Sequence, residues 1–377
     1  MKNAYKQPVK LPVYHTLLGI DFHQWLSMNR QNGLFSLNRF NKGLFLTIKS
    51  LRNTYDAYYE ARQYGPAIDG FTIKCPPIFI LGHWRSGTTF LEYILSQDPT
   101  FRYLDIIQSL YPKSFLSKWN YYANSFREIR RPMDNIPYKA NAPSEEEAAL
   151  AILASGSLYH GYYFPKNMDY HFHKYVLFKG ISFQELEKWK QAYLYLLKKL
   201  SLFHQGKPLL LKNPPNTCRI KVLLEMFPHA KFIHIHRNPY EVFLSRMHQY
   251  ENWAMALALQ PISKSTWEER VLRYYPEMMD AHFSQRESIP KGQYIEISFE
   301  ALKSQPLDIL AQIYNTLGLG EFSQAKPYFE TYLQSLKDYK QNEYTFERAV
   351  IDKVYKNWHQ TIDLWGYQTP KINNLSE

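Results

Sequence analysis

Cysteine is scarce in this chain of 377 residues, where Cys75 and Cys218 are the only two. Two cysteines cannot build a disulfide framework, and neither belongs to a CxxC spacing for zinc or redox chemistry. No stretch of about 18 apolar residues occurs, which argues against a membrane-spanning helix. The opening residues, MKNAYKQPVKLPVYH, lack the apolar core and cleavage site of a secretory signal. We therefore predict a cytoplasmic protein.

Basic residues outnumber acidic ones, which gives a net charge of +11 and a pI near 9.2. Such a charge indicates a negatively charged partner, and a nucleic acid, an anionic membrane surface and a phosphorylated small molecule all fit. Residues 1–75 hold ten Lys or Arg against four Asp or Glu, a surplus of six in a fifth of the chain. No block of five like charges occurs, which argues against a basic tail.

Short apolar segments alternate with helical patterns along most of the chain. We expect strands at 77–82, 208–213, 231–237 and 293–299, with helices between them. This alternation is typical of an α/β fold in which helices flank a parallel sheet and the site lies at the carboxyl ends of the strands. Leu44, Ile48, Leu51 and Tyr55 recur at helical spacing, so residues 1–70 are predicted to form a helical N-terminal extension and residues 71–377 the main domain.

The stretch GHWRSGTT at 82–89 lies between a predicted strand and a predicted helix. Its spacing is that of the phosphate-binding loop GxxxxGK[ST], except that Thr88 stands in place of the lysine. Glycines let backbone amides converge on an anion, and the following helix points its positive end at the same place. The missing lysine disfavours ATP or GTP hydrolysis, but the loop still suits a phosphate or a sulfate.

A second set of polar residues follows two other predicted strands. Lys212 ends one strand, Arg237 ends the next, and Ser245 lies two turns into the helix after that. Since the carboxyl ends of parallel strands meet at one edge of a sheet, all three are expected near the glycine loop. Together they would bind an anion at more than one point.

GHWRSGTTF and KFIHIHRNPYEVFLSRMH, with LKNPPN ahead of the latter, closely resemble the sulfotransferases that use 3′-phosphoadenosine 5′-phosphosulfate (PAPS). The resemblance covers most of residues 75–345, including RPMDNIP at 131–137 and the acidic APSEEEAAL, which are similar to a bacterial branch of that superfamily. It implies the P-loop-like sulfotransferase fold and an enzyme that releases adenosine 3′,5′-bisphosphate (PAP).

The resemblance also implies roles for individual residues. Arg85, Ser86, Gly87, Thr88 and Thr89 would bind the 5′-phosphosulfate. Arg237 and Ser245 would hold the 3′-phosphate, and the segment DYKQNEYTF at 338–346 resembles one that closes over the nucleotide, with Lys340 as its basic residue. The transfer builds charge on the bridging oxygen, and Arg85 and Lys212 are the candidate cations that stabilise it.

The acceptor hydroxyl needs a base. In cytosolic small-molecule sulfotransferases a histidine follows the strand lysine, but Pro214 stands there in this chain. Other branches use a glutamate, and Glu147 and Glu145 are the candidates here. The same SEEEAAL stretch also fits a helix N-terminus capped by Ser144, in which the acids serve the helix dipole.

Histidines offer further alternatives. His83 and His160 are rival bases, although a structural role fits either. HFH at 171–173 and HIH at 234–236 suggest metal pairs if they lie on strands, but no third ligand stands at a recognisable spacing, so we predict no metal.

The acceptor is predicted only by class. Aromatic residues between 159 and 172 suit a pocket for a sterol, phenol or lipid, with the basic N-terminal helices contacting a membrane, and they suit a sugar or simple core packing equally well. They are Tyr159, Tyr162, Tyr163, Phe164, Tyr170 and Phe172. A nucleotide phosphotransferase and a polyanion-binding protein remain as rival functions, the latter because of the high pI and 31 tyrosines. The sequence indicates no oligomeric state.

Overall fold

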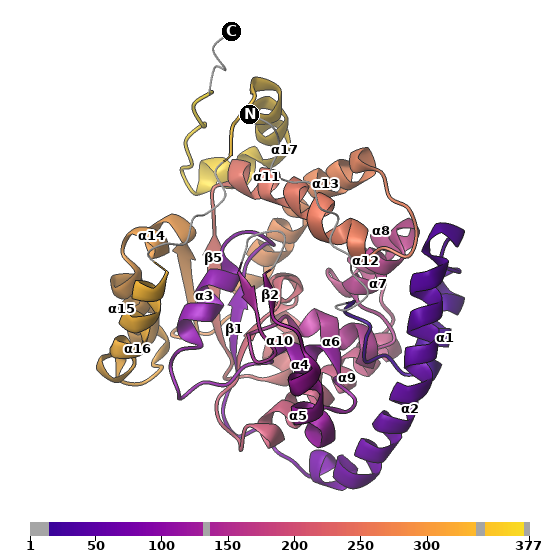
Figure 1. The fold of residues 1–377 in the computed structure, drawn as a ribbon. Coiled ribbons are helices and arrows are strands. Elements are labelled where there is room, and N and C mark those ends of the chain that lie inside the picture. Colours follow the sequence, from indigo (N-terminus) through magenta and orange to yellow (C-terminus); the bar gives the residue numbers. More distant parts are fainter. Residues whose placement is uncertain (1–14, 131–135, 337–343, 373–377) are drawn as a thin grey trace.

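A parallel sheet lies at the centre of the molecule (Figure 1). The computed structural model describes residues 15–130, 136–336 and 344–372. Within these ranges the sheet has four strands in the order β4-β1-β5-β6, all at predicted positions. Their bounds are β1 Ile78–Leu81, β4 Leu210–Lys212, β5 Lys231–His236 and β6 Tyr294–Ser298. The predicted α/β class and parallel sheet are therefore confirmed.

The two faces of the sheet are covered by different helices because successive strand residues point to opposite sides. Ile78 and Ile80 pack in a cluster with Leu91 of α3 and Ile313 of α15. Phe79 packs in another cluster, together with residues of α9 and α10. Both faces are thus buried, as the continuous apolar strand segments predict.

Helices make up most of the rest of the described chain, and those between residues 100 and 180 are short. From the N-terminus to β4 they are α1 Phe22–Asn32, η1 Leu37–Arg39, α2 Phe40–Asp69, α3 Thr88–Leu95, α4 Ile106–Leu110, α5 Phe115–Ser125, α6 Glu146–Leu153, α7 Leu158–Tyr163, η2 Pro165–Asn167, α8 Met168–Tyr175 and α9 Phe183–Phe203. A two-stranded antiparallel pair, β2 Ile129–Arg130 and β3 Pro137–Tyr138, lies in the same region.

The helices after β4 complete the layers around the sheet. They are η3 Pro214–Cys218, α10 Ile220–Met226, α11 Pro239–Gln249, the π-helical turn η4 Tyr250–Ala254, α12 Met255–Leu257, α13 Lys264–Arg286, α14 Phe299–Ser304, α15 Pro306–Leu317, α16 Phe322–Ser335 and α17 Arg348–Leu364. In Figure 1, α14 to α16 lie on one side of the sheet and α2 forms the opposite outer edge of the molecule.

The N-terminal helices pack directly on the sheet-bearing part of the chain. Asp21 caps α1 by accepting a hydrogen bond from the Gln24 amide at 3.0 Å. In α2, Glu60 forms a fully buried ion pair with Lys199 of α9. The Glu60–Lys199 ion pair holds α2 against the body of the molecule.

Candidate active site

The glycine loop joins β1 to α3 with a backbone that only a few residue types can adopt. Gly82 and Gly87 have φ values of +149° and +102°. A Cβ on Gly87 would lie 2.3 Å from Cδ2 of Phe299, and one on Gly82 would lie 2.5 Å from the Ile235 carbonyl oxygen. Arg85 also has a positive φ, of 73°, which is unusual for a side-chain-bearing residue and is typical of functional loops.

The loop has donors suited to an oxyanion. Thr88 and Thr89 begin α3, and no described side chain caps this helix at Gly87. The first amides of a helix have no intrahelical partner, and they carry the positive end of its dipole. The Ser86 hydroxyl is buried and has no hydrogen-bond partner among the described residues. An unsatisfied buried hydroxyl beside free amides fits the oxygen of a bound phosphate or sulfate.

Arg85, Ser245 and Arg237 meet at the carboxyl edge of the sheet, as the sequence predicts. The Arg85 Nε donates to Ser245 Oγ at 2.8 Å, and Arg237 Nη1 donates to the Arg85 carbonyl oxygen at 3.4 Å. The Arg237 guanidinium lies 4.7 Å from the centre of the Phe299 ring and is paired with Glu241 of α11. Arg85 thus contacts both residues predicted for the 3′-phosphate, Ser245 through its side chain and Arg237 through its backbone carbonyl.

Lys212 ends β4 among carboxylates. Its ammonium lies 2.8 Å from Glu145 Oε1 and 3.5 Å from Glu92 Oε2, and the Lys212 side chain is buried. Burial raises the pKa of Glu92 to about 8, against the attraction of Lys212. Glu92 is absent from the sequence-based predictions. The sequence does hold a sign of it, because Glu92 lies among the apolar residues of TTFLEYIL. Glutamate is seldom fully buried without a partner, so an acid in such a helix indicates a special role.

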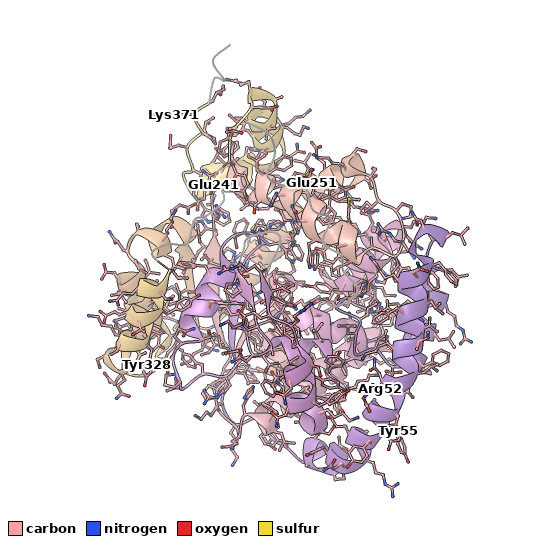
Figure 2. The ribbon with its side chains drawn as sticks, in the orientation of Figure 1. Arg52, Tyr55, Glu241, Glu251, Tyr328 and Lys371 are labelled. Carbon is pink, nitrogen blue, oxygen red and sulfur yellow. The ribbon has the colours of Figure 1, made fainter. Side chains whose placement is uncertain are left out.

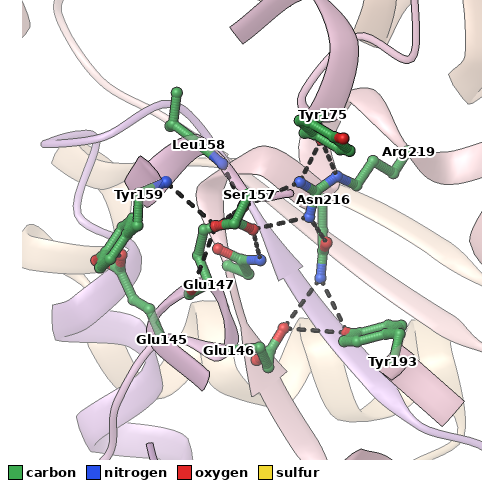
Figure 3. Close-up of polar contacts among 11 residues, drawn as sticks. Glu145, Glu146, Glu147, Ser157, Leu158, Tyr159, Tyr175, Tyr193, Asn216 and Arg219 are labelled. Carbon is green, nitrogen blue, oxygen red and sulfur yellow. Dashed lines mark hydrogen bonds and ion pairs between the residues drawn. The ribbon is translucent and has the colours of Figure 1, made fainter. Parts of the chain in front are cut away.

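The three glutamates of SEEEAAL have different environments, which Figure 3 shows in close-up. Glu145 is 23% exposed, and its Oε2 accepts a hydrogen bond of 3.1 Å from the Tyr159 hydroxyl. Glu146 is buried, its Oε2 accepts from Tyr193 and Asn216, and burial raises its pKa to about 7. Only Glu145 therefore combines partial exposure with direct contact to Lys212.

Glu147 lies in a buried ion pair, which does not suit its predicted role as a base. Its carboxylate is fully buried, 2.9 Å from Arg219 Nη1, and it also accepts hydrogen bonds from Ser157 and Asn213. Burial alone would raise the pKa of Glu147, but Arg219 and these donors lower it below its usual value. A carboxylate saturated in this way joins α6 to the segment after β4, which fits a structural ion pair.

Ser144 does not cap α6, contrary to the alternative interpretation of the acidic stretch. The N-cap residue is Glu145, and the Ser144 hydroxyl donates to Ser109 instead. Glu146 and Glu147 do occupy the first turn of the helix. The acidic stretch does form a helix N-terminus, as the alternative interpretation predicts, but Ser144 is not its cap.

The rival histidine bases are both buried and bonded to backbone. His83 donates to the Trp84 carbonyl at 2.9 Å and His160 to the Ala151 carbonyl at 2.8 Å. Burial lowers the pKa of His160 to about 4 and that of His83 well below its ordinary value. These contacts fit structural, neutral imidazoles.

Of the two histidine pairs, one lies on a strand and the other on a helix. HFH lies in helix α8, where His171 bonds to Asn32 and His173 to Glu277, so this pair does not share a face. HIH does lie on β5, and the structure brings His282 and Glu296 to His234, with ligand atoms within 4.8 Å of one another. No sequence spacing indicated this cluster.

The cluster around His234 is internally bonded. His234 Nδ1 lies 2.9 Å from Glu296 Oε2, which also lies 3.5 Å from the Arg286 guanidinium. Because a cation would have to compete with Arg286 for this carboxylate, we assign no ion to the cluster.

The aromatic residues suggested for an acceptor pocket mostly belong to the core. Tyr170 is exposed, and the Lys174 ammonium lies over its ring. The other five are buried in one cluster; they are Tyr159, Tyr162, Tyr163, Phe164 and Phe172. Tyr159 alone among these six bonds to Glu145, and its ring lies 5.7 Å from that of Trp253. Lys340 lies outside the described residues.

Comparison with known proteins agrees with this geometry. A family model described as "Sulfotransferase family" matches residues 76–324. An omega-hydroxy-beta-dihydromenaquinone-9 sulfotransferase from Mycobacterium bovis is 31% identical over 367 residues, which cover 95% of this chain and 93% of that protein.

Two solved structures share the fold. The sulfotransferase STF1 from Mycobacterium tuberculosis has a TM-score of 0.61 at 17% identity, covering 89% of this chain and 90% of its own. The sulfotransferase STF9 from Mycobacterium avium has a TM-score of 0.63 at 16% identity, covering 98% and 99%. None of the described helices is both long and apolar enough to cross a membrane. With its family match, its relative and its converging anion-binding residues, the chain is an enzyme of the sulfotransferase family, the PAPS-dependent family that its motifs resemble.

Proposed function

We propose that this enzyme transfers the sulfonate of PAPS to the hydroxyl of an apolar, lipid-type acceptor, in line and without a divalent metal. The contact that carries the proposal is the 2.8 Å hydrogen bond from Arg85 of the glycine loop to Ser245 of α11. It joins the group proposed for the phosphosulfate to the group proposed for the 3′-phosphate. A donor with a phosphosulfate at one end and a 3′-phosphate at the other has a use for both groups, whereas ATP has nothing for the second.

Each part of the donor would have its own residues. The amides of Gly87, Thr88 and Thr89 and the unpaired Ser86 hydroxyl suit the 5′-phosphosulfate. Arg237 and Ser245 suit the 3′-phosphate, with Arg85 between the two ends, and Lys340 stays a predicted contact. Binding of the 3′-phosphate would compete with Glu241 for the Arg237 guanidinium.

Glu145 and Lys212 would work as a coupled pair during transfer. The Glu145 carboxylate accepts the proton of the acceptor hydroxyl as the hydroxyl oxygen attacks sulfur. Once Glu145 is protonated, its ion pair with Lys212 weakens, and the ammonium is available to the charge that grows on the bridging oxygen of the leaving phosphate. Arg85 is the second cation for that charge.

The acceptor class rests on the relative, whose name specifies a hydroxylated menaquinone derivative. A comparable hydroxyl-bearing lipid would meet Glu145 beside Tyr159 and Trp253, whose rings offer apolar surface next to the carboxylate. We further propose that residues 71–377 form the catalytic domain, that residues 1–70 are a helical extension in contact with the membrane, and that the enzyme acts in the cytoplasm without nucleic acid.

A thermal-shift measurement tests the donor site. Because a ligand stabilises the native state by RT ln(1 + [L]/Kd), PAP without magnesium should raise the melting temperature clearly and ADP only slightly. Arg237→Ala should abolish the PAP response. The matched control is Arg348→Ala, which removes an exposed arginine paired with Asp352 on α17 and should leave the response intact.

Equal responses to PAP and ADP, or none, would contradict the donor assignment and direct attention to magnesium nucleotides and polyanions. After a positive result, transfer from labelled PAPS to a hydroxylated prenyl quinol, a sterol, a phenol and a sugar separates the acceptor classes. The same assay in EDTA tests the metal-free mechanism, which loss of activity would overturn.

A further inference from the structure

Helix α2 exposes its apolar face and buries its polar face, the opposite of an ordinary surface helix. Its apolar residues recur at steps of three and four, which normally marks the face turned to the core. Here that stripe faces outward, with exposures from 44% for Leu44 to 68% for Tyr55. We call the stripe the α2 face; it consists of Phe40, Leu44, Ile48, Leu51, Tyr55 and Tyr58.

The inward side of α2 consists mostly of small and polar residues, together with Leu46 and Ile68. Gly43, Ser50, Asn53, Asp56 and Glu60 are all buried. Asn53 donates to the carbonyls of Leu18 and Ile20, while Asp56 pairs with Lys118 and Glu60 with Lys199. Because these polar groups are satisfied inside the protein, the helix is held with its apolar stripe outward and cannot simply rotate to bury it.

Exposed apolar side chains are concentrated at this edge of the molecule. Of the nineteen large hydrophobic residues that are exposed in the described part of the chain, eleven lie between Leu26 and Tyr59. Soluble monomers seldom gather apolar side chains in this way without a partner. Figure 2 shows Tyr55 on this outer edge beside Arg52, and Tyr328 on the opposite side of the molecule.

The charges around the α2 face have one sign. From Phe22 to Arg62 the chain holds six Lys or Arg, and its only acids are Asp56 and Glu60, both of which point inward. The outer surface of α1 and of α2 up to Arg62 is therefore apolar, aromatic and basic. Two copies of this surface facing each other would bring like charges together, which disfavours a dimer. Anionic lipid headgroups attract the same charges.

We propose that the α2 face docks this enzyme on an anionic lipid bilayer. Leu44, Ile48 and Leu51 would enter the apolar boundary of the bilayer, the tyrosines at 55 and 58 would lie at headgroup level, and Arg52 would meet lipid phosphates. The helix lies in the membrane surface and does not cross it. Docking would bring the enzyme to an acceptor embedded in the membrane. This part of the inference rests on the proposed function.

Contacts connect the docking helix to the candidate acceptor site. Lys42 Nζ donates to the Ala256 carbonyl at 2.6 Å, so the first turn of α2 holds the segment that follows η4. Within η4, Trp253 packs on Tyr159, which bonds to Glu145. A lipid leaving the bilayer at the start of α2 would thus meet the segment that leads to the candidate base.

Flotation with lipid vesicles tests this proposal on the full chain. Vesicles of equal parts phosphatidylcholine and phosphatidylglycerol should bind the protein, whereas phosphatidylcholine alone should bind it at least about tenfold more weakly, and added salt should weaken the first interaction. The double substitution Ile48→Glu with Leu51→Glu should reduce binding about tenfold or more. Tyr55→Glu should weaken binding, whereas Tyr328→Glu, which changes another exposed tyrosine on the other side of the molecule, should not.

The controls separate docking from donor binding. The variants change exposed side chains, so their melting temperatures and PAP responses should match those of the unmodified protein. Transfer to a water-soluble acceptor should be unchanged in the double variant, and transfer to an acceptor embedded in vesicles should fall. Vesicle binding without any PAP response would leave docking intact and overturn only the proposed function.

Two results would overturn the docking proposal itself. One is vesicle binding that is absent or is unaffected by the double substitution. The other is a dimer in sedimentation that dissociates in the double variant, which would make the α2 face an interface between copies of this chain.

Discussion

At the scale of single residues, the two glutamates predicted as bases differ in the side chains that surround them. Glu145 is half-buried and contacts Lys212, whereas the carboxylate of Glu147 is saturated by Arg219 and three hydrogen-bond donors. Glu145→Gln should lower kcat by about 100-fold or more, because the proton acceptor is lost, and should change the melting temperature little. Initial rates and thermal melts on the same preparation check this.

Glu147→Gln should do the opposite. Removing one charge of a buried pair leaves Arg219 uncompensated, which costs about 3 to 5 kcal/mol of unfolding free energy. Denaturant titration measures the loss, and turnover per folded molecule should stay near that of the unmodified enzyme. A stable Glu147→Gln protein with turnover reduced to the level of Glu145→Gln would reverse the two assignments.

At the scale of elements, the conformation of the glycine loop limits what can replace Gly87. An alanine there would need φ near +102° and would place its Cβ 2.3 Å from the Phe299 ring. Gly87→Ala should destabilise the protein by roughly 1 to 3 kcal/mol and abolish the PAP response, because the loop amides move.

Gly65 offers a matched comparison in another element. It lies inside helix α2, and nothing stands within 4 Å of where its Cβ would be. Gly65→Ala should leave the PAP response unchanged and raise the unfolding free energy by up to about 1 kcal/mol, since alanine favours helix more than glycine. If both substitutions weakened PAP binding equally, the close packing at Gly87 would not explain the effect.

At the scale of the whole molecule, buried histidines govern the response to acid. Among the described residues, burial lowers the pKa of eight histidines below the ordinary value near 6.5; they are His15, His83, His160, His171, His204, His234, His236 and His282. Below pH 6.5 the unfolded chain therefore binds more protons at these groups than the native protein does, so acid favours unfolding.

Three buried carboxyls oppose this effect. Burial raises the pKa of Glu92 to about 8 and those of Asp105 and Glu146 to about 7, so their contribution is lost as the pH rises above 4.5. Since the histidines outnumber them, the unfolding free energy should fall as the pH drops from 6.5 to 4.5. Urea titrations across this range check the slope, and His160→Asn should make it shallower. A flat or inverse dependence would contradict the neutral, buried state of these rings.

The sequence by itself determined the local features of this protein. Glycine spacing, strand-length apolar runs and the residues that follow each strand predicted the loop, the four strands and the meeting of Arg85, Arg237 and Ser245. These features depend on neighbouring residues and on one rule, that parallel strands end at a common edge. For the same reason the local motifs by themselves indicate the family that the family model matches.

Only the tertiary structure decided which partners the polar side chains have. Arg219, 72 residues away in the chain, pairs with the Glu147 carboxylate, and Glu92 approaches Lys212 from a helix whose neighbouring residues are mostly apolar. The periodicity of α2 predicted a helix with an apolar stripe, but it could not show that buried partners for Asp56 and Glu60 would turn that stripe outward. Periodicity defines a face, and the partners that long-range packing brings to the opposite face decide which way it points.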